Sequence, residues 1–171
     1  MKLLIITIFF TMLSQINLSA QSENYLEKVK TLDSTIETLY SVISGDAGVK
    51  RDWDLFKFLF VEEAKLIPTR MIEGNPELTF LTPEGYVERS GAWLEENGFF
   101  EKEVARKEDT FGSVTHIFST YASFRTSKDK EPFARGINSI QLMNDGNRWW
   151  ILNIYWLNES EEHPLPSAYL K

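Results

Sequence analysis

The chain has 171 residues, contains no cysteine, and carries a net charge of −7 from 18 basic and 25 acidic side chains. Without cysteine it can form neither disulfides nor thiolate metal sites. An acidic chain with no basic stripe is also a poor partner for phosphate backbones, so we expect no binding to nucleic acid.

The N-terminus has the build of an export signal. Lys2 precedes an apolar run over Leu3–Leu13, and the more polar stretch that follows ends in a small residue, Ala20. The run is too short to span a bilayer, which takes about 20 residues. We therefore predict a signal peptide over residues 1–20 that is cleaved after Ala20. The chain would then be periplasmic or secreted, free of the membrane, and without a lipid anchor because no cysteine can receive one.

Three helices are predicted in the first half of the mature chain. The first, over residues 22–44, has apolar residues spaced by three and four. They are Tyr25, Val29, Leu32, Ile36, Leu39 and Ile43. A shorter aromatic helix is predicted over residues 52–60. The third, over residues 83–97, has the clearest start, because Thr82 is a good N-cap and a proline follows it.

Strands dominate the rest of the chain. Turn residues separate long β-like stretches, and the predicted strands are Ala64–Pro68, Phe99–Asp109, Val114–Thr126, Phe133–Met143 and Arg148–Trp156. Long consecutive strands form an antiparallel meander that must curve. The predicted fold class is α+β, with N-terminal helices packed on a strongly curved antiparallel sheet, a cone-shaped half-barrel. Residues 21–157 form this single domain, and residues 158–171 an extended C-terminal tail.

Two strings carry a resemblance to a known superfamily. They are FFEKEVARKEDTFGSVTHIFSTYASF from Phe99 and PFARGINSIQLMNDGNRWWILNIYW from Pro132. With the order of elements, they resemble the nuclear transport factor 2-like superfamily, which includes ketosteroid isomerase, scytalone dehydratase and polyketide-cyclase-like (SnoaL-like) domains, and most of all its small exported bacterial members. The likeness covers Glu27 to Trp156. It implies a pocket on the concave sheet face and dimers through the outer face, but no particular reaction, because no catalytic set of the enzymatic relatives matches.

Three residues are candidates for catalysis. His116 lies in a predicted strand, where it could act as a general base or donate a hydrogen bond to a ligand; the alternative is a half-buried histidine satisfied by a neighbour. Tyr40 and Tyr86 could point their hydroxyls into the pocket as partners of a developing oxyanion. They could equally be core tyrosines with hydrogen-bonded tips.

Arg135 and Asn138 are polar candidates on a strand that faces the others. The arginine could bind a carboxylate of a ligand, or form a cross-strand ion pair with Glu101 or Glu103. By alternation, Arg106 is expected on the opposite face of the strand from these two glutamates.

The aromatic residues are expected to build the pocket wall. With His116, Tyr86, Arg135 and Asn138, the predicted ligand contacts are Trp53, Phe56, Phe60, Trp93, Trp150 and Trp156. In the last strand, the set Trp150, Leu152, Ile154 and Trp156 is predicted to line the pocket. The other set, Trp149, Ile151, Asn153 and Tyr155, is predicted to meet a second subunit or the tail. No ligand spacing or glycine-rich loop suggests a metal or cofactor.

Three functions remain open. The first is a binding domain for a small apolar or amphipathic molecule. The second is a proton-transfer enzyme, an isomerase, dehydratase or cyclase-like lyase that uses His116. The third is a non-catalytic dimerisation or interaction module with a filled interior.

Overall fold

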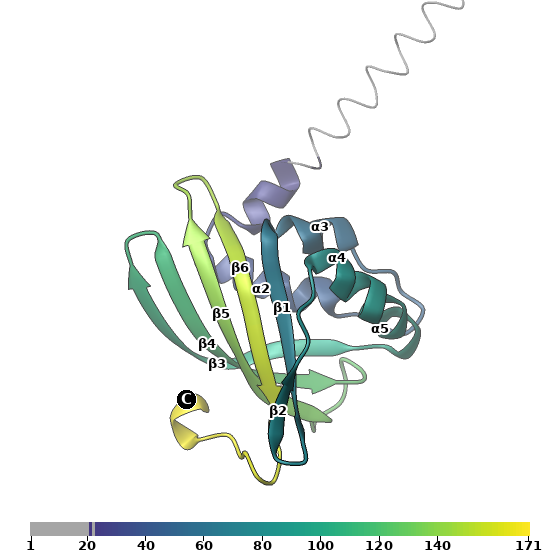
Figure 1. Ribbon diagram of the computed structural model, residues 1–171. Helices are drawn as coiled ribbons and strands as arrows, with labels where there is room; N and C mark the ends of the chain where they lie inside the picture. The colour runs from purple at the N-terminus through teal and green to yellow at the C-terminus, as the bar shows by residue number, and fades with distance from the viewer. Residues whose placement is uncertain (1–20, 22) are drawn as a thin grey trace, which may run out of the picture.

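The computed structural model of the chain (Figure 1) describes residue 21 and residues 23–171. The predicted signal peptide lies outside these described residues. The fold is α+β: helices cover one face of a curved six-stranded sheet. None of the helices in this described part has the length and hydropathy that a membrane span requires.

The first predicted helix is interrupted. Residues 23–28 are helical, the chain then turns, and α2 (Leu32–Ile43) begins anew. The side chain of Thr31 accepts a hydrogen bond from the backbone of Ser34, and the side chain of Ser34 accepts one from the backbone of Thr31. This capping box satisfies the free amides of a new helix start. The prediction of one continuous helix is wrong because the apolar spacing runs through the break and conceals it.

The later helices follow the prediction closely. They are α3 (Trp53–Phe58), α4 (Pro83–Tyr86), the π-helical η1 (Val87–Gly91) and α5 (Ala92–Asn97). The last three form one continuous helical segment. Its N-cap is Thr82, whose side chain accepts a hydrogen bond from the backbone of Gly85. The segment ends at Gly98, whose backbone has a φ of 69°, a value that glycine adopts without strain. A π-helical turn within this segment was not predicted.

The sheet has the order β2-β1-β6-β5-β4-β3. Its strands are β1 (Phe60–Ile72), β2 (Asn75–Leu78), β3 (Phe100–Phe111), β4 (Val114–Phe124), β5 (Ala134–Asn144) and β6 (Trp149–Asn158). The meander from β3 to β6 is antiparallel, as predicted. However, β1 pairs with β6 in parallel, so the sheet as a whole is mixed. The first strand is also longer than the predicted Ala64–Pro68. Its charged and buried residues alternate only in part, so the two-residue period of a strand could not be recognised over its full length.

Two bulges change which residues face the concave side. In β3, Glu103 pairs with Tyr121 and Ala105 with Thr120, so Val104 is an extra residue. In β6, Ile151 and Asn153 pair with consecutive residues of β5, so Leu152 is extra. A bulge bends its strand and shifts the side-chain alternation beyond it by one residue.

The bulge in β6 divides its predicted inner set. Ile151 is fully buried in the core, and Ile154 and Trp156 lie on the same side beyond the bulge. Trp150 and Leu152 do not lie on that side of the strand, and the side chain of Leu152 is 37% exposed. The prediction was therefore right for the second half of the strand and wrong for the first.

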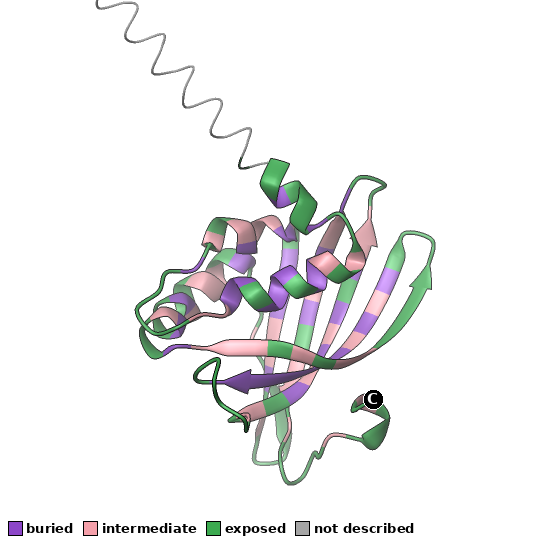
Figure 2. Ribbon diagram, turned by 180° about the vertical axis from the view of Figure 1, so that it is seen from behind, coloured by how far each residue is buried: buried purple, intermediate pink, exposed green. Residues whose placement is uncertain are grey.

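The core lies between α2, α3 and the concave face of the sheet. Its fully buried side chains include Ile36, Phe56, Leu59, Ile117, Ile140 and Ile151. Figure 2 shows buried residues interspersed with exposed ones along the strands behind α2. Residues of the helices and of the concave face also line a cavity beside this core.

The C-terminal tail folds back on the outer, convex side of the sheet. A short 3-10 helix, η2 (Ser167–Tyr169), lies against β4: the Thr120 hydroxyl donates a hydrogen bond to the carbonyl of Tyr169 at 2.6 Å. The ring centroids of Tyr169 and Phe118 are 5.3 Å apart. The tail thus contacts the outer face of β4, whereas the last strand β6 was one of the surfaces it was expected to cover.

Candidate functional site

The concave face encloses a cavity of about 410 Å³, called the inner cavity from here on. Its apolar wall includes Leu39, Phe56, Leu66, Tyr86, Trp93 and Trp156, and its polar wall Tyr40, Glu101, Tyr121, Ser123, Asn138 and Asn158. Tyr86 stacks on Phe56, with ring centroids 5.3 Å apart. Strands β3 to β6 supply the group of polar side chains that includes Glu101, Ser123 and Asn138, and aromatic side chains come from both the helices and the strands.

A directed chain of hydrogen bonds crosses the polar wall. The Asn138 amide donates to the Tyr40 hydroxyl at 3.0 Å, and the Ser119 hydroxyl donates to Oε1 of Glu103 at 2.6 Å. Tyr40 and Ser119 lie 2.7 Å apart. Because the single proton of Ser119 is committed to Glu103, Tyr40 must donate to Ser119. Burial, first of all, and then the nearby Glu101 raise the pKa of Tyr40, so its hydroxyl keeps its proton.

Glu101 is the buried acid of the inner cavity. Its Oε2 accepts a hydrogen bond from the Ser123 hydroxyl at 2.7 Å, and its Oε1 accepts none from the described residues. The side chain keeps some solvent contact, yet protein atoms surround it densely. This desolvation raises its pKa to about 7, and the bond from Ser123 opposes the rise only in part. Glu101 therefore exchanges its proton near neutral pH.

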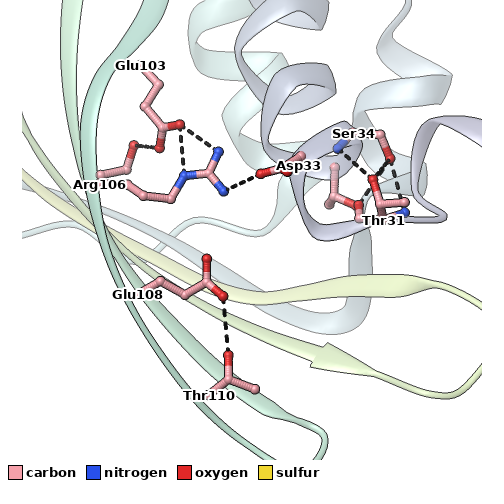
Figure 3. Close-up of polar contacts among 9 residues, drawn as sticks. Thr31, Asp33, Ser34, Glu103, Arg106, Glu108 and Thr110 are labelled. Atoms are coloured by element: carbon pink, nitrogen blue, oxygen red, sulfur yellow. Dashed lines mark hydrogen bonds and ion pairs between the residues drawn. The ribbon is translucent and has the colours of Figure 1, made fainter.

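Glu103, two residues along, is in the opposite situation. Its Oε2 accepts two bonds from Arg106, at 2.9 and 2.7 Å, and Arg106 also pairs with Asp33 of α2 at 2.8 Å (Figure 3). The bulge at Val104 brings Arg106 onto the face of Glu103, so the predicted opposite placement is wrong. Arg106 thus forms ion pairs with Glu103 and Asp33 and none with Glu101.

A second hollow of about 630 Å³, the side groove, lies between α2 and β3. Arg106, Asp33 and Glu103 line it. Tyr40 and Glu101 line both the side groove and the inner cavity, so these two side chains form part of the partition between them.

Comparison with known proteins informs the fold alone. No protein-family model matches the sequence, and no curated protein matches it. Among solved structures, a nuclear transport factor 2-like protein of unknown function from Silicibacter pomeroyi is 13% identical, with a TM-score of 0.52 over 75% of this chain and 92% of its own. The chain has the nuclear transport factor 2-like fold.

Two further structures agree. A protein of unknown function with a cystatin-like fold from Nostoc punctiforme is 8% identical, with a TM-score of 0.57 over 76% of this chain and 90% of its own. A protein of unknown function from Mycobacterium tuberculosis is 12% identical, with a TM-score of 0.56 over 80% of this chain and 79% of its own. The fold expected from the sequence resemblance is confirmed, and identities this low carry no function.

In this nuclear transport factor 2-like fold, about half of the predicted site residues come together. Those that line the inner cavity are Tyr40, Phe56, Tyr86, Trp93, Asn138 and Trp156. Trp53 lies behind the wall, where its ring meets Phe56 edge-on and its Nε1 donates to Glu95 at 2.8 Å. Phe60 packs in the core against Phe56, with ring centroids 5.1 Å apart. Neither lines the cavity.

His116 lies on the wrong face for the role proposed for it. The next residue, Ile117, is fully buried in the core on the concave side, so alternation directs His116 to the convex side. There its Nε2 lies 2.9 Å from the Ser139 hydroxyl and its ring meets Phe118. A proton-transfer mechanism that joins His116 to Tyr40 or Tyr86 is therefore wrong, because the sheet separates them.

Arg135 and Trp150 are also outside the cavity. Arg135 forms a two-point ion pair with Glu159, at 2.8 and 3.1 Å, and not with the expected glutamates of β3. Trp150 covers the guanidinium of Arg148, which lies 3.5 Å from its ring centre, and its Nε1 donates to Asp145 at 2.7 Å. Both residues hold the ends of strands in place.

Sequence reasoning did not identify Glu101 as the cavity acid, nor Ser123 as its partner. One signal was available: Ser119, Tyr121 and Ser123 alternate along a buried strand, opposite acids that alternate along its neighbour. Among the described residues, no group of three or more acids and histidines is placed to hold a metal ion.

Proposed function

We propose that the protein binds one small amphipathic molecule in the inner cavity. The observation that carries the proposal is a hollow of about 410 Å³ with an aromatic wall and a few converging polar groups. Ligand sites are typically concave, largely apolar, and a few hundred cubic ångströms in volume. A module with a filled interior would not have this space.

The polar end of the ligand would lie against Glu101. Among the described residues, Oε1 of Glu101 and the hydroxyl of Tyr86 form no hydrogen bond, and Oγ1 of Thr69 is a further wall atom without a partner. The apolar body would lie against Phe56, Leu66 and Trp156. Orientation would thus come from a small number of hydrogen bonds and affinity from apolar contact.

Blocking the cavity tests this proposal. Ser90 of η1 lines the inner cavity, and Glu96 of α5 is exposed on the same helical segment. We expect Ser90→Trp to weaken binding of a fluorescent apolar probe at least tenfold, and Glu96→Trp to leave it unchanged. Ala134→Trp, on the opposite wall, is a second blocking variant if the first does not fold. Equal binding by a folded blocking variant would contradict the proposal. Native mass spectrometry of purified protein would show any ligand already bound.

Acid–base chemistry is a second candidate, with Glu101 in place of His116 as the base. The observation that favours it is a carboxyl whose pKa is raised by desolvation to about 7. A benzisoxazole probe tests for a base in an apolar pocket: the carboxylate takes the ring C–H proton, the N–O bond breaks, and a cyanophenolate is released. Turnover that Glu101→Gln abolishes and His116→Ala preserves would support this function. No turnover above a bovine serum albumin control would count against it.

We also propose that the chain is exported, on the basis of the charged, apolar and small-residue sequence over residues 1–20. The intact mass of protein recovered from the periplasm or medium of a bacterial host should correspond to a chain that lacks those residues. A full-length mass would contradict export by this signal.

Association of two copies through the outer sheet face remains a proposal. On that face of β6, Leu152 and Tyr155 are 37% and 40% exposed, which is apolar surface that a partner could cover. Light scattering after size-exclusion chromatography should give twice the chain mass, and Tyr155→Lys should give the monomer. A monomeric parent protein would refute the dimer.

A further inference from the structure

Glu101, the buried acid of the inner cavity, has no cation to neutralise it. None of the ion pairs among the described residues includes Glu101. The nearest arginine on its strand, Arg106, already holds two carboxylates, on Glu103 and Asp33. A buried carboxylate without a positive partner is costly, and proteins retain one where it serves a function.

The charged and titratable groups around Glu101 do not supply that cation. From the packed elements these are Tyr40, Asp33 and Glu37 on α2, Tyr86 on α4, Tyr121 on β4, Asp129 after β4, and Glu103, Lys102 and Arg106 on β3. Lys102 lies over the ring of Phe124, 4.7 Å from its centre. Arg125, after β4, lies over the rings of Phe133 and Trp93, 4.1 and 5.1 Å from their centres, and forms no ion pair with Glu101. At the far end of the inner cavity, Arg70, Arg89 and Glu77 line the wall, and the side chains of all three are exposed.

Aromatic side chains line the same cavity. Tyr86 lies stacked on Phe56, and Tyr121 and Trp156 also line the cavity. The negative face of an aromatic ring attracts a cation, most strongly where water is excluded. One unpaired carboxylate oxygen beside several aromatic rings is the combination that recognises an organic ammonium.

We propose that the ligand of the inner cavity is an amphipathic amine whose protonated nitrogen pairs with Oε1 of Glu101. This inference rests on the proposed function and names the chemical class of its ligand. The ammonium group would donate to Glu101 and to the free hydroxyl of Tyr86, and its hydrocarbon part would fill the space between Phe56 and Trp156. Binding would then supply the positive partner that Glu101 lacks.

A matched pair of probes tests the class of ligand. 1-Naphthylmethylamine and 1-naphthylmethanol share one ring system and differ in charge at a single position. At pH 8 we expect isothermal titration calorimetry to give at least tenfold tighter binding for the amine. Glu101→Gln should remove the preference for the amine and leave the affinity for the alcohol within about twofold, since only an ion pair is lost. Glu37→Gln, which removes an exposed acid of α2, should keep the preference.

The preference should also depend on pH. With a pKa of about 7, roughly one Glu101 carboxyl in a hundred is ionised at pH 5, so the affinity for the amine should fall at least tenfold between pH 8 and pH 5. The affinity for the alcohol should change little over the same range.

The outcomes separate the two proposals. If neither probe binds folded protein, the proposed binding function fails and the inference fails with it. If both probes bind equally, if the alcohol binds more tightly, or if Glu101→Gln keeps the preference for the amine, the inference is refuted while the binding function stands.

Discussion

Replacing Glu101 with glutamine should stabilise the protein above neutral pH. The carboxyl is buried beside the Ser123 hydroxyl and lacks a cation, so its ionised form is disfavoured in the folded state. Glutamine has nearly the same shape, its amide oxygen can accept the same hydrogen bond, and it carries no charge. The substitution therefore removes the electrostatic cost and retains the packing.

The magnitude follows from the pKa. Raising the pKa of a carboxyl from its ordinary 4.5 to about 7 corresponds to about 3 kcal/mol, since each unit of pKa is worth about 1.4 kcal/mol. Well below pH 4.5 the carboxyl is protonated in both the folded and the unfolded chain, and the cost is absent. Between pH 4.5 and about 7 the unfolded chain ionises first, so the free energy of unfolding falls as the pH rises. Above about pH 7 the whole cost is present.

Urea denaturation of both proteins at pH 4.5, 6 and 8, followed by circular dichroism, measures this effect. The difference in the free energy of unfolding between Glu101→Gln and the parent should be near zero at pH 4.5 and should grow to about 3 kcal/mol in favour of the variant at pH 8. Because other groups titrate equally in both proteins, the difference isolates Glu101.

Glu103→Gln is the matched control on the same strand. It removes a charge that Arg106 neutralises, so we expect a loss of about 1–3 kcal/mol and no gain at pH 8. The reasoning would be refuted if Glu101→Gln were less stable than the parent at pH 8, or if its stability difference did not change with pH.

Three further changes have definite expected results. Arg51→Met should cost about 3–5 kcal/mol in urea denaturation, because the Arg51 guanidinium donates to the carbonyls of Ile43, Gly45 and Leu94 behind α2; a loss below 1 kcal/mol would contradict that role. Gly136→Ala should lower the melting temperature, because the new methyl group would overlap the Tyr121 hydroxyl and the carbonyl of Leu157; an unchanged melting temperature would show that β5 shifts freely. His116→Ala should leave apolar probe binding within about twofold, as expected for a surface substitution away from the site; a tenfold loss would place His116 at the cavity after all.

Local chemistry explains why much of the architecture was predictable. Thr82 and Gly98 mark the ends of their helical segment by side-chain capping and by a positive φ, both of which depend on neighbouring residues alone. The turn at Asn144 to Asn147 likewise separates two strands that pair in the predicted antiparallel way. The wall residues Phe56 and Trp156 were identified because aromatic side chains in such elements turn to the interior.

Non-local contacts account for the errors. The bulges at Val104 and Leu152 depend on how neighbouring strands pair, yet each reverses the face of every residue that follows it. One bulge brings Arg106 to Glu103, and the other places Ile154 and Trp156 on the face opposite to Trp150. His116 was assigned to the cavity because its strand was recognised as buried on one face, but alternation alone leaves open which set faces inward.

Composition, capping residues and apolar spacing were sufficient to predict helices followed by a curved meander, because these features act over a few residues along the chain. The chemistry of the cavity was not predictable in this way. Whether a carboxylate has a positive partner depends on which basic side chain the register of the strands places beside it. Arg106 lies beside Glu103 and pairs with it. Glu101 is left in a hollow with a hydroxyl group and aromatic rings as its neighbours. Its pKa and the ligand we infer for it follow from that placement.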